Sequence, residues 1–424
     1  MDLDKLSLHF RNLAALGEED SPVISCYINN EAGRAGYRDA TDARIREIRK
    51  ALPADQRLDF EQALGRIETF LAADVKADAK GLAIFSRGGE KPFFDALQFR
   101  LPLPNLMTVD AVPHIYELVL LKDMYHRYIV LISTESHARI LEVSVGEVTK
   151  ELWTQRPELR RRVGREWTKE HYQNHHRDRT QKFLKEKIEI LDRLFATEAH
   201  THLMIVGSPR TVAGVRAILP KRLQDKLVEG GPRSGHASTA DVVSATLSSF
   251  ADHEQTESLE TAGLFLDELR TGGLAVAGAE ATLEALAQGQ VDVLVLSEFY
   301  APPAGWKCRE CACVGVHQAP VACPQCGERT VAPLNLKEEM VRIAERDGCS
   351  VEIVRNSDVL LEVGGVGCLL RYLTSEQRAD QTPSWRRPNH VRWNGSPAPE
   401  KTRGGDAFMM GATWDAGALN SRGS

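Results

Sequence analysis

The chain has 424 residues and a formal net charge of −6, with 26% charged and 42% hydrophobic residues. This length and composition predict an ordinary soluble protein of two to four domains, each large enough for its own core. The longest strongly apolar runs, such as 291–296, have only the length of a strand, so we expect no membrane-spanning segment. Residues 1–6 have neither a basic nor an apolar region, so we expect no signal peptide.

Residues 1–122 are predicted to form an N-terminal α/β domain. Apolar and β-branched residues predict strands over 21–28 and 81–86. Apolar residues recur at helical spacing over 42–52 and 57–73. The mixture of two periodicities favours a sheet covered by helices.

Residues 123–255 are predicted to form a middle domain. Two short strands, 128–133 and 138–143, flank a polar turn and predict a hairpin. A long polar helix over 167–195 follows, and then a buried strand over 202–206.

Residues 256–374 are predicted to form a C-terminal α/β/α domain, and the polar stretch 252–260 is suited to the boundary before it. Helices and strands alternate in this part of the chain, as expected for a layered fold. The predicted elements are helix 279–287, strand 291–296, helix 336–347 ended by Gly348, and strand 350–354.

Residues 375–424 differ from the rest of the chain in composition. Pro, Gly, Ser and Arg dominate there, with scattered Trp. Such a composition buries too little apolar surface to fold, so the segment is predicted to be a disordered tail.

Five cysteines lie within nineteen residues and carry the strongest chemical signal in the sequence. Two C-x-x-C pairs are separated by eleven residues, which is the spacing of a zinc ribbon, here over 306–330. Gly327 follows the second pair, where a tight turn needs positive φ. The predicted Zn²⁺ ligands are Cys308, Cys311, Cys323 and Cys326.

The fifth cysteine of this group, Cys313, either replaces Cys311 as a ligand or remains a free thiol. Four thiolates close the coordination shell of a zinc ion, so the predicted site is structural rather than catalytic. Cysteines grouped for a metal, with Cys26, Cys349 and Cys368 isolated in apolar runs, indicate a reducing cytoplasm.

Residues 156–193 hold twelve Lys and Arg against seven Asp and Glu. Basic side chains contact phosphates and aromatic side chains stack on bases, so this segment is the predicted RNA-binding surface. A solvated helix with ion pairs four residues apart is the simpler alternative. The candidate RNA contacts are Arg160, Arg161, Arg162, Arg165, Glu166, Trp167, His171, Tyr172, His175 and His176.

His171 and His175 share one face of the predicted helix and could also hold a metal ion. An H-E-x-x-H pattern is missing around them, so we favour imidazoles that face RNA.

Several stretches resemble the archaeal and eukaryotic class-I release-factor and Pelota family. They are the hairpin 128–148, the strand end 203–209, the helix–Gly–strand pattern 278–297, and Gly364-Gly365 leading to Leu370-Arg-Tyr372. The resemblance implies an α/β fold with a release-factor-like architecture of three domains, and a zinc ribbon inserted in the C-terminal α/β/α domain.

The family's functional motifs are missing from the expected places. Release factors carry Gly-Gly-Gln at the start of the long middle helix, where this chain has Arg165-Glu166-Trp167 after Gly164. The stop-codon-reading motifs of the first domain are also missing, and 106–113 offers only Met-Thr-Val-Asp-Ala-Val between its ends. Stop-codon-dependent termination is therefore not expected.

The resemblance implies a cytoplasmic translation factor that binds rRNA or tRNA in the ribosomal A site, similar to Balon-type hibernation factors or stalled-ribosome factors. No chemistry of its own is expected. In the family the third domain docks a translational GTPase, and elongation factor Tu is the partner by analogy. Two alternatives remain: a peptidyl-tRNA hydrolase that uses Glu166 or Gln173, and an RNA-binding regulator that never enters the ribosome.

Overall fold

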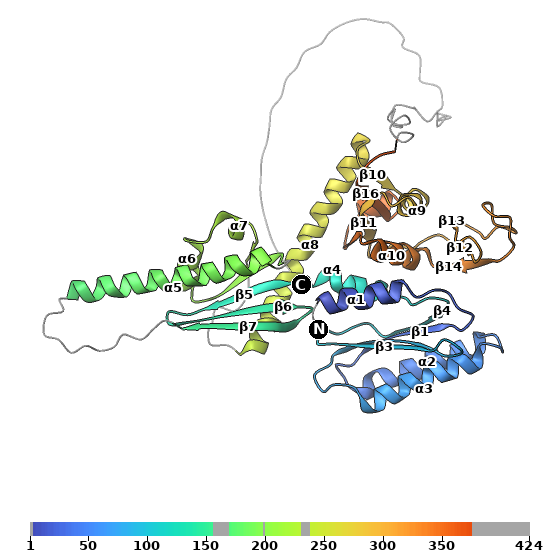
Figure 1. Ribbon diagram of the computed structural model, residues 1–424, viewed down its shortest axis with the longest axis horizontal. Helices are drawn as coiled ribbons and strands as arrows, with labels where there is room; N and C mark the ends of the chain where they lie inside the picture. Colours follow the sequence, from blue (N-terminus) through green and yellow to red (C-terminus); the bar gives the residue numbers. More distant parts are fainter. Residues whose placement is uncertain (1–2, 156–168, 198–199, 230–237, 375–424) are drawn as a thin grey trace, which may run out of the picture. The chain divides into compact units, whose positions relative to one another are not determined.

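The computed structural model describes residues 3–155, 169–197, 200–229 and 238–374 (Figure 1). All of them belong to one compact unit, Met1–Gln381. Their strands form four sheets, three of them covered by helices. Within these described ranges, every helix is too short or too polar to span a lipid bilayer.

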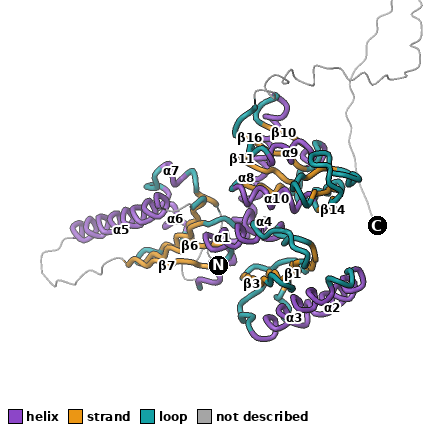
Figure 2. The backbone as a smooth tube through the Cα atoms, turned by 45° about the vertical axis from the view of Figure 1, so that its right-hand side comes forward, coloured by secondary structure: helices purple, strands orange, loops and turns teal. Residues whose placement is uncertain are grey.

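The N-terminal sheet has four antiparallel strands in the order β3-β2-β1-β4. Alternate residues of β1 face opposite sides, because side chains alternate along a strand. Ile24, Cys26 and Ile28 pack with α2 and α3, which lie side by side in both views (Figure 1, Figure 2). Tyr27 faces the core that contains α1. The elements are α1 (Leu3–Ala14), β1 (Val23–Asn29), α2 (Arg34–Ala51), α3 (Arg57–Ala73), β2 (Gly81–Arg87), β3 (Phe93–Phe99) and β4 (Leu106–Asp110).

The middle sheet has five strands in the order β7-β6-β5-β8-β9, with β5 parallel to β8. Ile129 and Leu131 of β5 face the core built by α5, α6 and α7. Val130 and Ile132 face the first half of α8. The elements are α4 (Tyr116–Met124), β5 (Tyr128–Ser133), β6 (His137–Ser144), β7 (Glu147–Gln155), α5 (Lys169–Thr197), β8 (His202–Gly207), α6 (Pro209–Arg216), α7 (Lys221–Gln224) and β9 (Leu227–Val228).

The C-terminal sheet has the order β10-β16-β11-β15, with β11 parallel to β15. Phe265 and Leu266 of α8 cover one face, and α9 and α10 cover the other. Gly367 of β16 lets Phe265 approach, since a Cβ there would lie 2.3 Å from its ring. The elements are α8 (Thr239–Thr271), β10 (Ala275–Ala277), α9 (Ala279–Ala287), β11 (Val291–Ser297), α10 (Leu336–Asp347), β15 (Ser350–Val354), α11 (Asp358–Glu362) and β16 (Val366–Leu370).

The predicted bounds of several elements are confirmed. Helices over 57–73, 279–287 and 336–347 begin and end as predicted, as does strand 350–354. The last of these helices, α10, starts where the Asn335 side chain accepts hydrogen bonds from backbone N–H groups. It ends at Gly348, which takes a left-handed conformation with φ 70°.

The predicted hairpin of the middle sheet is longer than the sequence indicated. A third strand, β7, follows β6 through a turn in which Val145 and Gly146 both have positive φ. Valine rarely adopts that conformation, because its branched Cβ crowds the backbone, so the turn carries little sequence signal.

The polar stretch 252–260, predicted to suit a domain boundary, is the middle of α8. This helix of 33 residues packs on two sheets in turn, through Phe250 on the middle sheet and Phe265 on the C-terminal sheet. The other predicted boundary, at 122/123, falls inside α4. The domain limits therefore stay a prediction, and helices cross both of them.

Glu338 of α10 caps the beginning of α4. Its Oε2 accepts hydrogen bonds from the backbone N–H groups of Ile115 (3.0 Å) and Tyr116 (3.2 Å). Its Oε1 lies 3.4 Å from Nδ1 of His114, and Oδ2 of Asp110 lies 3.1 Å from Nε2 of the same ring. Burial alone would lower the pKa of His114, but the hydrogen bonds to Asp110 and Glu338 outweigh it and raise the pKa to about 9.

We expect this histidine to make stability pH-dependent above neutrality. A folded-state pKa above the unfolded value of about 6.5 gives a stabilisation that is complete below pH 6.5 and is lost as the pH rises through 9. The upper bound is about 3 kcal/mol. Urea unfolding at both ends of this range should show a larger loss for wild type than for His114→Gln. Equal losses in the two proteins would contradict this role.

Candidate functional site

The clustered cysteines lie on a small sheet of their own, inserted between β11 and α10. It consists of β12 (Gly305–Cys308), β13 (Val314–Val316) and β14 (Val331–Leu334), in the order β13-β12-β14. Cys308 ends β12, and Cys311 lies in the turn after it. Cys323 and Cys326 lie in the connection between β13 and β14. The fold thus brings the two C-x-x-C pairs together.

The four sulfur atoms have the spacing of a tetrahedral site. The Sγ atoms of Cys308 and Cys326 are 3.6 Å apart, those of Cys311 and Cys323 are 3.5 Å apart, and all four lie within 4.8 Å of one another. A zinc ion with Zn–S bonds of about 2.3 Å requires edges of about 3.8 Å. All eight cysteines of the chain are free thiols, so the cluster is not a pair of disulfides.

The two cysteine turns repeat one backbone pattern. The N–H of Ala312 donates to the carbonyl oxygen of Cys308 (3.0 Å), and the N–H of Gly327 donates to that of Cys323 (2.8 Å). Both donors have positive φ, 57° for Ala312 and 80° for Gly327. The positive φ predicted for Gly327 is confirmed, whereas Ala312 gave no sequence signal, because alanine rarely adopts this conformation.

The cluster also favours the ionised form of one ligand. Backbone N–H groups, first that of Cys326, lower the pKa of the Cys323 thiol to about 6. A thiolate is the form that binds a metal ion. Cys313 lies outside the set of four, and burial raises the pKa of its thiol.

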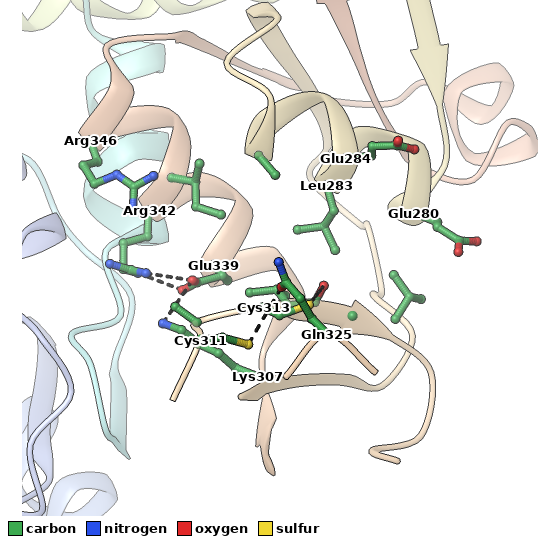
Figure 3. A pocket seen from close by; sticks show the side chains of 16 residues that line it. Glu280, Leu283, Glu284, Lys307, Cys311, Cys313, Gln325, Glu339, Arg342 and Arg346 are labelled. Atoms are coloured by element: carbon green, nitrogen blue, oxygen red, sulfur yellow. Dashed lines mark hydrogen bonds and ion pairs between the residues drawn. The ribbon is translucent and has the colours of Figure 1, made fainter. Parts of the chain in front are cut away.

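A cavity of about 550 Å³ lies between the cysteine turns, α9 and α10 (Figure 3). Its cationic side chains are already paired with carboxylates. Lys307 Nζ lies 2.6 Å from Oε1 of Glu18, and Nε and Nη2 of Arg342 each donate to Glu339 at 2.7 Å. Arg346 bonds Asp347. These pairings argue against a phosphate site, so the cavity adds no ligand chemistry to the cysteines.

The predicted RNA contacts fall mostly where side chains are not described. Residues 160–167 lie outside the described residues. His171, Tyr172, His175 and His176 lie on α5, of which only the backbone is described there. The helix begins at Lys169, two residues after the predicted start, so one residue, Thr168, separates it from the tripeptide 165–167 in the sequence.

The described half of α5 has one buried face and one exposed face that carries both basic and acidic side chains. Phe183, Leu191 and Leu194 pack on the middle sheet. Lys187, one of the twelve basic residues counted in the sequence, is 1% exposed, and its Nζ donates to Oγ of Ser133 at 2.7 Å. Because its side chain is buried, Lys187 does not contribute to an RNA-binding surface. The exposed basic side chains of this half are Lys182, Lys185 and Arg193.

The structure also brings together a second group of potential metal ligands that the sequence did not reveal, namely His202, His253 and Glu257. Only the separation of His253 and Glu257 by four residues, which places them on one helix face, could have indicated it. His202 comes from a different element, β8.

Comparison with known proteins shows what the chain is similar to. Residues 113–251, about a third of the chain, match the sequence model of the bacterial archaeo-eukaryotic release factor family 10. The chain is a release-factor/Pelota-like protein. The matched residues form the middle sheet with α5 and the first part of α8. A search of curated proteins returns no match.

Three solved structures match the chain at low sequence identity. An archaeal translation termination factor, aRF1, is 16% identical, with 88% of this chain and 99% of that chain covered and a TM-score of 0.25. Pelota from Archaeoglobus fulgidus is 12% identical, with 88% and 93% covered and a TM-score of 0.33. The C-terminal domain of a peptide chain release factor from Methanosarcina mazei is 24% identical, with 33% and 98% covered and a TM-score of 0.26. Identities and scores this low carry no argument about function.

Proposed function

We propose that this protein is a ribosome-associated translation factor that binds the A site as a hibernation or stalled-ribosome factor. It neither reads stop codons nor hydrolyses peptidyl-tRNA. The observation that supports this proposal is the sequence Arg165-Glu166-Trp167, one residue before α5, in the part of the chain that matches a release-factor family.

The residue types before α5 argue against a site of hydrolysis at Arg165-Glu166-Trp167, which we call the tip. Hydrolysis of the ester needs a positioned water and donors for the developing oxyanion. Release factors supply them from a loop whose glycines allow close approach of the backbone. Arg165, Glu166 and Trp167 cannot adopt glycine's conformations at low cost, and Trp167 stands where the glutamine belongs. This tip is suited to stacking and phosphate contact.

The N-terminal domain supports the proposal that the protein does not read stop codons. Residues 106–110, near the place of the missing codon-reading motifs, are strand β4, which pairs with β1 from Val23 to Tyr27. As the edge strand of this sheet, β4 is held by β1 along one side and is extended strand rather than a free loop. The segment therefore has a structural role in the sheet.

The cysteine cluster is proposed to be a zinc ribbon that binds one Zn²⁺ through Cys308, Cys311, Cys323 and Cys326. With four thiolate ligands the ion has no open position, so its role is to hold β12, β13 and β14 together. This small sheet buries few apolar side chains, chiefly Trp306, and needs such a crosslink.

A translational GTPase, for which elongation factor Tu is the bacterial candidate, is the proposed protein partner in the cytoplasm. The yeast protein Dom34, among the structures similar in fold, is described as interacting with Hbs1. The assignment to this chain rests on the resemblance of its third domain to the family and remains an analogy.

Simple assays distinguish the proposed A-site factor from two alternative functions. A peptidyl-tRNA hydrolase that positions water with Glu166 or Gln173 would release labelled peptide from stalled ribosomes. An RNA-binding regulator would not co-sediment with ribosomes. The proposed factor should co-sediment and release no peptide above the buffer level.

Ribosome binding is expected to weaken steeply with salt and to depend on Arg160, Arg161 and Arg162. Replacing all three by glutamine removes three phosphate contacts, so the slope of log K against log salt should flatten by about two to three units. Co-sedimentation over a series of salt concentrations measures the slope.

A matched control loses three charges from α2, through Arg38→Gln, Arg46→Gln and Lys50→Gln. All three side chains are exposed on that helix. The control should keep the wild-type slope. An unchanged slope in the first triple variant, or an equal change in the control, would place the RNA-binding surface elsewhere.

A further inference from the structure

His202, His253 and Glu257 form a cluster separate from the cysteines, where α8 packs against the beginning of β8. His202 begins β8, whereas His253 and Glu257 lie one helical turn apart on α8. Glu257 Oε1 lies 3.0 Å from Nε2 of His202 and 3.4 Å from Nε2 of His253. One carboxylate oxygen thus faces two imidazole nitrogens.

The hydrogen bonds around His202 indicate which of its nitrogens carries the proton. Its Nδ1 lies 2.8 Å from Oγ1 of Thr201, and this hydroxyl donates its own hydrogen to the carbonyl oxygen of Arg127 at 3.1 Å. The hydroxyl oxygen can therefore only accept from the ring, which places a proton on Nδ1. In the neutral ring, Nε2 then presents a lone pair to Glu257 Oε1.

Two acceptors that face each other at 3.0 Å repel unless a positive charge lies between them. Either a second proton on His202 or a cation can supply that charge. A cation could also be shared with Nε2 of His253, which lies 3.4 Å from the same oxygen. The rings of His202 and His253 also meet edge to face, with centroids 5.0 Å apart.

The distances fit a small tetrahedral ion. Bonds of about 2.0–2.1 Å to nitrogen and oxygen require ligand atoms about 3.3–3.4 Å apart. Of the two distances from Glu257 Oε1, 3.4 Å matches this value and 3.0 Å is slightly shorter, and the three ligand atoms all lie within 4.8 Å of one another. Only small adjustments of the half-exposed His253 and Glu257 side chains would complete the site.

A buried carboxylate supports the ring of His202 from behind. Glu254 is 8% exposed, and its Oε1, which has no hydrogen bond from any described residue, lies 3.3 Å from Nδ1 of His202. Its other oxygen bonds Nδ1 of His126 at 2.9 Å. A carboxylate beside the non-ligating nitrogen is the usual support of a metal-binding histidine, because it orients the ring.

We infer that His202, His253 and Glu257 form a binding site for a divalent ion of the zinc class, separate from the cysteine cluster. The side chains of His253 and Glu257 are 36% and 47% exposed, so a fourth position is open to water. The ion would crosslink β8 of the middle sheet to the centre of α8. Imidazole and carboxylate ligands suit Zn²⁺ and exclude the soft ions that prefer thiolates.

The test is a calorimetric titration of the full chain with Zn²⁺, in which wild type should bind two equivalents. In the Cys323→Ser background the cysteine site is removed, and the remaining equivalent reports this site alone. His253→Ala or Glu257→Gln in that background should weaken its binding at least tenfold. X-ray absorption of the bound zinc should show nitrogen and oxygen neighbours without sulfur.

Two control variants keep the result specific. His137→Ala removes an exposed histidine on β6, and Glu260→Gln removes an exposed carboxylate on α8, so neither should change the affinity. The inference is overturned if the Cys323→Ser protein binds no zinc, if both ligand variants bind it as well as their parent, or if the controls weaken it equally. Circular dichroism confirms that each variant is folded.

Discussion

Replacing Cys323 by serine is expected to release the zinc of the cysteine cluster and to destabilise the small sheet β13-β12-β14 by several kcal/mol. The free energy of binding a structural zinc ion is also free energy of folding, with apparent values of about 10–16 kcal/mol in isolated zinc fingers. Cys323 is buried at the centre of the cluster, so serine cannot replace its thiolate. Native mass spectrometry and urea unfolding measure the two effects.

Cys313→Ser is the matched control, because the same substitution then affects a thiol outside the set of four. It should keep the zinc and change stability by less than about 1 kcal/mol. If Cys313→Ser lost the zinc while Cys311→Ser kept it, Cys313 and not Cys311 would be the zinc ligand. Wild-type protein with no metal at the cluster, or with disulfides in 308–326, would refute the zinc ribbon.

Trp167→Ala is expected to weaken ribosome binding about ten- to hundredfold at constant salt, equivalent to about 1.4–2.7 kcal/mol. The reason is that an indole at the tip can stack on an unpaired base, an interaction of about 1–3 kcal/mol. Trp167→Phe keeps an aromatic ring and should recover most of the affinity. Co-sedimentation of purified ribosomes with each variant gives the measurement.

A peptide-release assay with the same proteins distinguishes ribosome binding alone from hydrolysis of peptidyl-tRNA. Wild type should release no labelled peptide from stalled ribosomes above the buffer level. Peptide release by wild type that disappears in Glu166→Gln, with ribosome binding intact, would show that Glu166 positions a water. The hydrolase would then replace the binding factor as the function of this chain.

Much of the cysteine cluster could be predicted because its signal is local. A C-x-x-C pair forms one turn, and the insertion of 11 residues between the pairs needs no knowledge of the rest of the fold. The helices α3, α9 and α10 were predictable for a similar reason, since their apolar spacing, and in α10 also the caps Asn335 and Gly348, are local to the segment. Local chemistry was sufficient for these elements.

Contacts between distant segments could not be predicted. His202 and His253 are separated by fifty residues in sequence and meet only because α8 packs along the middle sheet. Lys187 looked like another basic residue of an exposed helix, but its stem packs inward and its amine reaches Ser133. The length of α8 was missed because its polar centre resembles a linker, although Glu254 and Ser258 within it are buried.

The continuity of α8 has a consequence for dissecting this protein into fragments. A cut at the predicted limit between 255 and 256 would divide one hydrogen-bonded helix and leave about four unpaired N–H and four unpaired C=O groups at the new ends. Each fragment would also hold only a few turns of helix to cover its sheet. The two sheets are therefore expected to fold as a single cooperative block, with Gly272, the residue that ends α8, as the natural place for an insertion or a tag.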